Sequence, residues 1–167
     1  SEMCIRDSSD GIGDGLIVIG DAQFIATASD TSVILDNTTN AFGSIGAVSD
    51  GLVRITEADG TVLNGIAAGT FDLVSGGDVE DVVNGSIVVT GEADILAASG
   101  GGNVTLGDDD RVLELGALDI RGANLSIDET SADGITLADA AGISLEISTA
   151  GDIVSDAGST LTITGAV

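Results

Sequence analysis

The chain has 167 residues, enough for one domain with a sizeable core, and 43% of them are hydrophobic. Acidic residues number 28 against four basic ones, which gives a formal net charge of −24 at pH 7. Such a surface repels phosphates, so nucleic acid is excluded as a partner, and no apolar run approaches the ~20 residues that membrane insertion needs.

The first eight residues, SEMCIRDS, differ from the rest of the chain. They contain the only cysteine, Cys4, and the only methionine, Met3. The peptide Met-Cys-Ile-Arg-Asp is also the translation of ATG TGT ATA AGA GAC, a transposon end used in sequencing libraries. We therefore expect residues 1–8 to be an adapter-derived artefact and the chain to be a fragment of an environmental gene. Without them the net charge is −23 and no cysteine remains.

Residues 9–15 form a short lead-in that contains DGIGDG. This segment is faintly similar to the nonapeptide G-G-x-G-x-D of calcium-binding β-rolls, but it occurs once and does not recur every nine residues. The later stretch SGGGNVTLGDD departs from the same pattern at Asn103. A calcium-stabilised secreted repeat protein is therefore an alternative and not the favoured interpretation.

Self-similarity dominates the rest of the chain. Residues 16–36 align to residues 87–107 at an offset of 71, and residues 59–92 align to residues 133–166 at an offset of 74. We therefore expect one repeat array over residues 16–167, with units at about 16–86 and 87–160 and a truncated third unit that begins with LTITGAV.

Each unit divides into shorter coils, marked by a small or polar residue before an apolar one. The pairs follow one another at spacings of 24, 25, 22, 25 and 27 residues, which predicts about six coils of about 25 residues. They are Gln23-Phe24, Ala47-Val48, Asp72-Leu73, Asp94-Ile95, Asp119-Ile120 and Glu146-Ile147.

Short segments within the coils alternate apolar and polar residues, which is typical of half-buried strands. Gly, Asn and Asp clusters, such as SGGGN (99–103) and GDDD (107–110), indicate turns between them. Short strands on this period predict an all-β fold, a β-solenoid. The predicted strands include 104–106, 125–127, 135–137, 143–147 and 161–163.

Four acidic residues precede an apolar residue in successive predicted coils: Asp72, Asp94, Asp119 and Glu146. If aligned, they form a column of carboxylates about 4.8 Å apart, the spacing of neighbouring strands. The column is expected to consist of solvated surface acids, and weak calcium sites along it are the alternative. No metal, cofactor or catalytic residue is assigned. Asp108, Asp109 and Asp110 are expected to form a solvated turn.

The aromatic and basic residues are the remaining candidates for binding or catalytic groups. Phe24, Phe42 and Phe71 align with aliphatic residues of the second unit, so all three are expected in the core and no aromatic platform for a glycan remains. The arginines Arg54, Arg111 and Arg121 are the candidates for the base of a polysaccharide lyase. None of them lies in a recognisable acid cluster in the sequence, so no enzymatic activity is expected.

The run ADGITLADAAGISLEISTAGDIVSDAGSTLTITGAV resembles the repeat regions of large bacterial exoproteins of the filamentous haemagglutinin type. Those regions carry similar DITL-, GSLTIT- and AGDI-like phrases, and the resemblance covers residues 16–167. It implies a right-handed parallel β-helix, a secreted or cell-surface location, and a role as adhesin or stalk. The expected partners are a surface receptor or the extracellular matrix, and the neighbouring repeats of the same chain. A β-helical polysaccharide lyase or hydrolase is the second alternative.

Overall fold

The computed structural model describes residues 15–29, 31–83, 85–107 and 112–165, and almost all of its regular structure is β-strand. The strands predicted at 104–106, 125–127, 135–137, 143–147 and 161–163 are all present, with shifts at their ends. The elements are β1 (Ile17–Ala26), β2 (Val33–Leu35), β3 (Ala41–Glu57), β4 (Thr61–Ser75), β5 (Val79–Asp81), β6 (Ser86–Ala97), the 3-10 turn η1 (Ala98–Gly100), β7 (Val104–Leu106), β8 (Val112–Arg121), β9 (Asn124–Glu129), β10 (Ile135–Gly142), β11 (Ser144–Thr149) and β12 (Ile153–Ile163).

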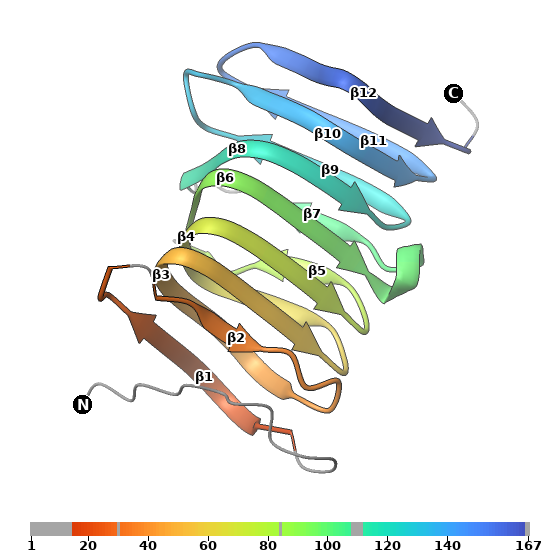
Figure 1. The fold of residues 1–167 in the computed structure, drawn as a ribbon. Coiled ribbons are helices and arrows are strands. Elements are labelled where there is room, and N and C mark those ends of the chain that lie inside the picture. The colour runs from red at the N-terminus through yellow and green to blue at the C-terminus, as the bar shows by residue number, and fades with distance from the viewer. Residues whose placement is uncertain (1–14, 30, 84, 108–111, 166–167) are drawn as a thin grey trace.

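The strands stack in parallel as a β-solenoid of about seven turns, which confirms the predicted fold class. Long strands form one continuous series, β1–β3–β4–β6–β8–β10–β12, and short strands form a second, β5–β7–β9–β11. Each turn of the chain lies beside the next, so β1 and β12 lie at opposite ends of the stack (Figure 1). The right hand of the coil and the longer two-unit repeat stay predictions.

Columns of inward-facing side chains make up the core, each with one residue from each turn, and three of them are described here. The most complete one is aliphatic throughout and fully buried over six turns: Leu35, Ile55, Leu73, Ile95, Ile120 and Ala140. The second column contains Phe24, Ala47, Ile66, Ile87 and Leu113. The third contains Thr61, Val79, Val104, Leu125 and Leu145. Each large aliphatic side chain in these columns contributes roughly 1.5–3 kcal/mol by its burial.

The coils are less regular than the sequence period predicts, and most of them are shorter. Along the first column, the shortest step in sequence is from Ile55 to Leu73 and the longest is from Ile95 to Ile120. The differences arise in the turns: β6 and β7 are separated by residues 98–103, whereas β8 and β9 are separated only by residues 122–123. The coil length therefore follows the length of each turn and not a fixed sequence period.

One corner of the solenoid is stabilised by polar side chains that bond from turn to turn. The Asn103 N–H donates to Asp78 Oδ1 at 2.7 Å, Asn124 Nδ2 donates to Asn103 Oδ1 at 2.7 Å, and Ser144 Oγ donates to Asn124 Oδ1 at 2.9 Å. These bonds satisfy polar groups at the place where the chain bends, and they hold four successive turns in register.

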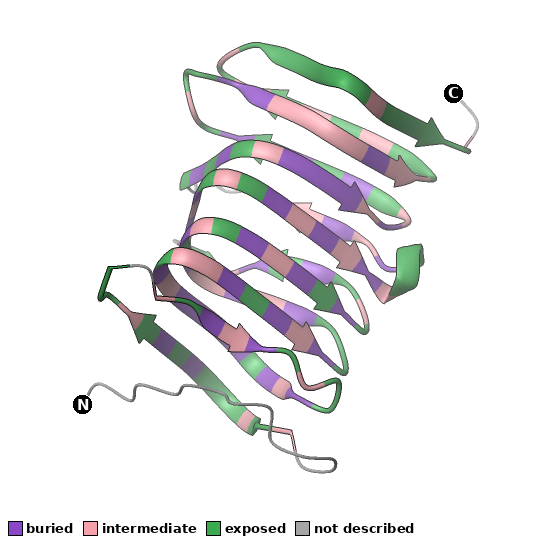
Figure 2. Cartoon of the chain, viewed as in Figure 1, coloured by how far each residue is buried: buried purple, intermediate pink, exposed green. Residues whose placement is uncertain are grey.

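Burial decreases toward both ends of the stack (Figure 2). In β12, Leu161 pairs with the buried Ala140 but is itself 61% exposed, and at the other end Ile19 is 95% exposed. The same position in the coil is therefore part of the core in the middle of the stack and lies in solvent at its end.

Candidate functional site

Four aspartates lie in register on neighbouring strands and form what we call the acidic ladder: Asp72 on β4, Asp94 on β6, Asp119 on β8 and Asp139 on β10. They precede the buried residues Leu73, Ile95, Ile120 and Ala140, and alternation along the strand turns them outward. The in-register position below Asp72 belongs to Arg54 on β3, and the one above Asp139 belongs to Thr160 on β12.

The predicted carboxylate column is confirmed at three of its four positions and wrong at the fourth. Glu146 lies on β11 and pairs with Ser126 of β9, away from the ladder. Asp139 takes its place, because the coil that starts at Asp119 is shorter than predicted and returns to the ladder at Asp139. Because the turn at residues 122–123 is short, the chain reaches the ladder early, on β10. Glu146 then lies on β11, in the series of short strands.

Two arginines are paired with the ladder, although neither lies in an acid cluster that is recognisable in the sequence. Arg54 Nε lies 2.6 Å from Asp72 Oδ2, with both side chains partly exposed. Arg121 lies two residues after Asp119 on β8, and its Nη2 is 2.5 Å from Asp119 Oδ2. Arg111 lies outside the described residues. Arg54 and Asp72 meet because strands from separate parts of the sequence lie in register, so their pair is not visible as a sequence motif.

The centre of the ladder is its least solvated part. Asp119 is only 9% exposed, and its Oδ1 is buried without a hydrogen-bond partner. Burial raises the pKa of Asp119, Arg121 lowers it, and the neighbouring carboxylates of Asp94, Asp139 and Glu92 raise it again. Burial likewise raises the pKa of Asp94, against the effect of Arg121 and together with that of Asp72.

The described residues contain no group of three or more His, Cys, Asp or Glu side chains arranged to hold a metal ion. The ladder carboxylates follow one another in a line, and two of the four already bond an arginine. Asp108, Asp109 and Asp110 and most of DGIGDG lie outside the described residues, as does Cys4, so the expectations for them stay predictions.

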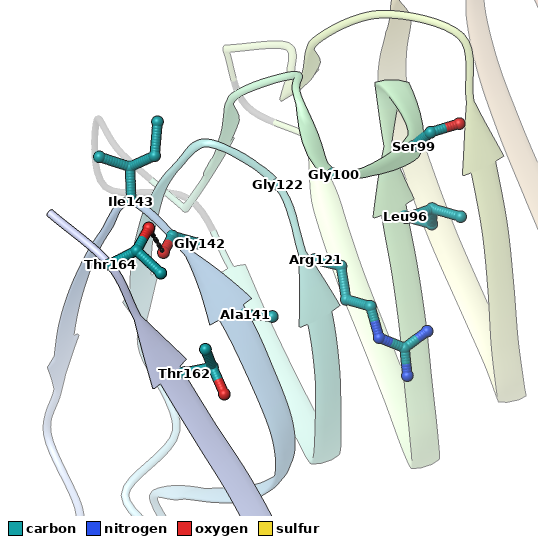
Figure 3. A pocket seen from close by; sticks show the side chains of 10 residues that line it. All are labelled: Leu96, Ser99, Gly100, Arg121, Gly122, Ala141, Gly142, Ile143, Thr162 and Thr164. Atoms are coloured by element: carbon teal, nitrogen blue, oxygen red, sulfur yellow. Dashed lines mark hydrogen bonds between the residues drawn. The ribbon is translucent and has the colours of Figure 1, made fainter.

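A shallow groove lies beside the ladder, around Arg121 (Figure 3). Its volume is about 360 Å³, and it extends from η1 to the end of β12. Leu96, Ala141 and Ile143 supply apolar surface, and hydroxyls come from Ser99, Thr162 and Thr164. The Arg121 side chain reaches from β8 toward the strand that carries Leu96, its in-register partner.

The wall of the groove at η1 is the most strained backbone among the described residues. Ala98 and Ser99 have φ angles of 43° and 53°, and these are the non-glycine residues with positive φ in the described chain. Such a conformation costs a non-glycine residue about 1–2 kcal/mol. The longest coil, from Ile95 to Ile120, contains this turn, so the turn is the main local departure from a regular stack.

Three acidic residues lie in the core, which the sequence interpretation missed. Glu57 is 3% exposed, Asp81 is 7% exposed and Glu129 is 1% exposed. Glu57 Oε1 accepts the Phe42 N–H at 2.8 Å, and Glu129 Oε2 accepts the Thr149 hydroxyl at 2.7 Å. The signal was present in the alternation: Glu57 and Glu129 each follow a buried isoleucine by two residues, the inward phase of the strand.

Burial raises the pKa of Glu57, the Phe42 N–H lowers it, and the neighbouring Asp59 carboxylate raises it again. Glu57 Oε2 and Thr61 Oγ1 are both buried without a hydrogen-bond partner. An unsatisfied buried polar group costs about 1–3 kcal/mol, so this corner is a weak point of the core when Glu57 is ionised.

The prediction that the phenylalanines belong to the core is confirmed. Phe24, Phe42 and Phe71 are 7%, 5% and 2% exposed. Phe24 and Phe42 pack edge to face, with ring centroids 5.9 Å apart. These buried rings offer no stacking surface to a ligand.

Comparison with known protein families gives a match over part of the chain. Residues 50–111, from the second half of β3 to the segment before β8, match a family described as repeats of unknown function (DUF5649). No curated protein and no solved structure matches the chain. No helix in the described part of the chain has the length and apolar character that a membrane span needs.

Proposed function

We propose that this chain is a rod-forming segment of a secreted or cell-surface adhesin or stalk protein, with a structural and interaction role. The observation that carries the proposal is the unbroken aliphatic column over six turns from Leu35 to Ala140. Each turn adds about 4.8 Å, so about seven turns span roughly 34 Å. A chain built in this way gains length in proportion to its number of coils, as a spacer at a surface requires.

The sequence resemblance to filamentous haemagglutinin-type exoproteins and the match to a family of repeats support the same proposal. The surface supports it too, because the net charge of −24 disfavours nucleic acid and anionic lipid and leaves proteins or glycans as partners.

The adhesin role is tested by binding of the purified chain to immobilised matrix proteins and glycans. Binding to a defined component that persists in 0.5 M NaCl supports the proposal, because exposed charges are largely screened at that ionic strength. Binding that disappears with salt indicates only nonspecific attraction to the acidic surface.

The calcium-stabilised alternative stays a prediction. Its test is thermal unfolding in millimolar calcium, compared with a monovalent salt at equal ionic strength. If the two midpoints agree, specific calcium sites are excluded for the folded chain.

The polysaccharide-degrading alternative also stays a prediction, and the Arg121–Asp119 pair beside the groove is the place where it would act. Release of unsaturated sugars from acidic polysaccharides is the direct assay. Activity that Arg121→Ala abolishes would replace the structural role with an enzymatic one.

A further inference from the structure

We propose that the centre of the acidic ladder holds one proton shared between Asp94 and Asp119, which makes the contact between β6 and β8 a pH-sensitive joint that is most stable in mildly acidic solution. The proposal does not depend on whether the protein is an adhesin. It rests on the hydrogen-bond donors that the structure supplies to each carboxylate.

Two of the four ladder aspartates, at the ends of the ladder, each accept a hydrogen bond from a donor that does not reach the other three. Asp72 at one end accepts from Arg54 Nε at 2.6 Å, and Asp139 at the other end accepts from the Thr160 N–H at 2.5 Å. Arg121 Nη2 donates a hydrogen bond to Asp119 Oδ2. Within the described chain no hydrogen bond or ion pair reaches the Asp94 carboxylate, and Asp119 Oδ1 has none either.

The carboxylate oxygens without a donor belong to residues that face each other. Asp94 and Asp119 are in-register partners on adjacent strands, whose backbones lie about 4.8 Å apart along the stack. Both are acceptors when ionised, so neither can satisfy the other. A proton taken up from water turns one of them into a donor, and its O–H bonds the carboxylate oxygen of its neighbour once the two side chains turn toward each other. One proton thus removes a repulsion and satisfies a buried acceptor.

The charged groups that face this pair act in both directions. Asp72 on β4, Asp139 on β10 and Glu92 on β6 favour proton uptake, whereas Arg121 on β8 opposes it. Arg54 on β3 is bound to Asp72 at the end of the ladder. Burial is the largest cause, and together with the carboxylates it raises the pKa of both members of the pair. The pair titrates as a unit, so the proton is not assigned to one residue.

The sign of the pH dependence follows from this balance. Between the ordinary pKa of aspartate and the raised value, the folded chain binds a proton that the unfolded chain has lost. The unfolding constant therefore rises with pH in that window, by up to about tenfold for each pH unit for one proton. The joint is stable below the window, and its stability decreases as the pH rises through it.

The test compares two variants that each remove one negative charge. Asp94→Asn places an amide N–H₂ donor beside Asp119 and mimics the protonated state at every pH. Glu146→Gln is the matched control, because Glu146 is exposed and lies away from the ladder. Urea unfolding is measured from pH 4 to 8 in 0.5 M NaCl, where the Debye length is about 4 Å and general charge repulsion is reduced.

We expect Asp94→Asn to be more stable than the unmodified chain at pH 8, with an advantage that shrinks toward pH 4. Glu146→Gln should follow the pH profile of the unmodified chain. Parallel profiles for the two variants would overturn the proposal, because the effect of Asp94 would then be that of any surface charge.

A second measurement needs no variant. In a carboxyl-carbon NMR titration of the unmodified chain, the Asp94 and Asp119 signals should move together at a pH above ~4, the ordinary aspartate value. Ladder signals that all titrate at or below that value refute the shared proton, even if Asp94→Asn fails to fold.

Discussion

Replacing Leu73 by alanine tests whether the aliphatic columns hold the solenoid together. Leu73 is 0% exposed and lies in register between Ile55 and Ile95. A buried Leu→Ala change costs about 2–5 kcal/mol, and the larger values apply where the surroundings cannot close the cavity. The strands on both sides of Leu73 are fixed by their ladders, so we expect a cost in the upper half of that range.

The matched control is Leu161→Ala, the same substitution in the same column but at a position that is 61% exposed. Its cost should stay below about 1 kcal/mol, since exposed substitutions have small effects. The chain lacks Trp and Tyr, so urea unfolding is followed by far-UV circular dichroism. Hydrogen exchange should show the loss of protection concentrated in β3, β4 and β6. Equal costs for the two variants would refute the column as the source of stability.

Three further changes test the buried acid, the turns and the ladder. Glu57→Gln should stabilise the chain by about 1–3 kcal/mol at pH 8 and by less at pH 5. The reason is that the raised pKa of Glu57 makes the unmodified protein more stable as the pH falls. Urea unfolding at both pH values measures the gain, and equal gains at the two pH values would contradict the prediction. Gly107→Ala should destabilise the chain far more than Gly158→Ala. Both glycines have positive φ, which alone costs an alanine about 1–2 kcal/mol. A Cβ at Gly107 would in addition lie 2.0 Å from a backbone oxygen, whereas a Cβ at Gly158 would meet no atom within 4 Å. Thermal unfolding compares them, and similar midpoints would show that the turn can relax. Arg121→Gln should raise the pKa of Asp119 further in a carboxyl-carbon titration, and an unchanged titration would show that the guanidinium does not act on the ladder.

The sequence was sufficient for the fold because its signal is local and repeated. Alternation marks strands such as β7 and β9, and glycine-rich clusters mark turns, so a stack of short parallel strands follows without any knowledge of pairing. The length of each coil could not be predicted from the sequence, for a physical reason. It depends on how many residues each turn uses, and both a short turn at 122–123 and a longer one at 98–103 fit between well-formed strands.

The site shows the same limit at single residues. Asp72, Asp94 and Asp119 were found because the two coils that join them are close in length to the assumed period. Beyond Asp119 the coil shortens, so Glu146 was placed in the ladder instead of Asp139. The buried acids were missed for another reason: acidic residues were assumed to face solvent, although the alternation around Glu57 and Glu129 points inward.

The unequal coils also determine the electrostatics of the surface. In a solenoid with a strict period, an outward-facing acidic residue lies between the equivalent acidic residues of the coils above and below it. A long column of like charges results. Here the shortest coil places Arg54 beneath Asp72, and two residues beyond Asp119 the chain supplies Arg121. These arginines donate hydrogen bonds to Asp72 and to one oxygen of Asp119, and a backbone N–H donates to Asp139. The repulsion between carboxylates is therefore concentrated on Asp94 and the remaining oxygen of Asp119. A chain with a net charge of −24 therefore confines the unbalanced part of its ladder to one pair of neighbouring strands.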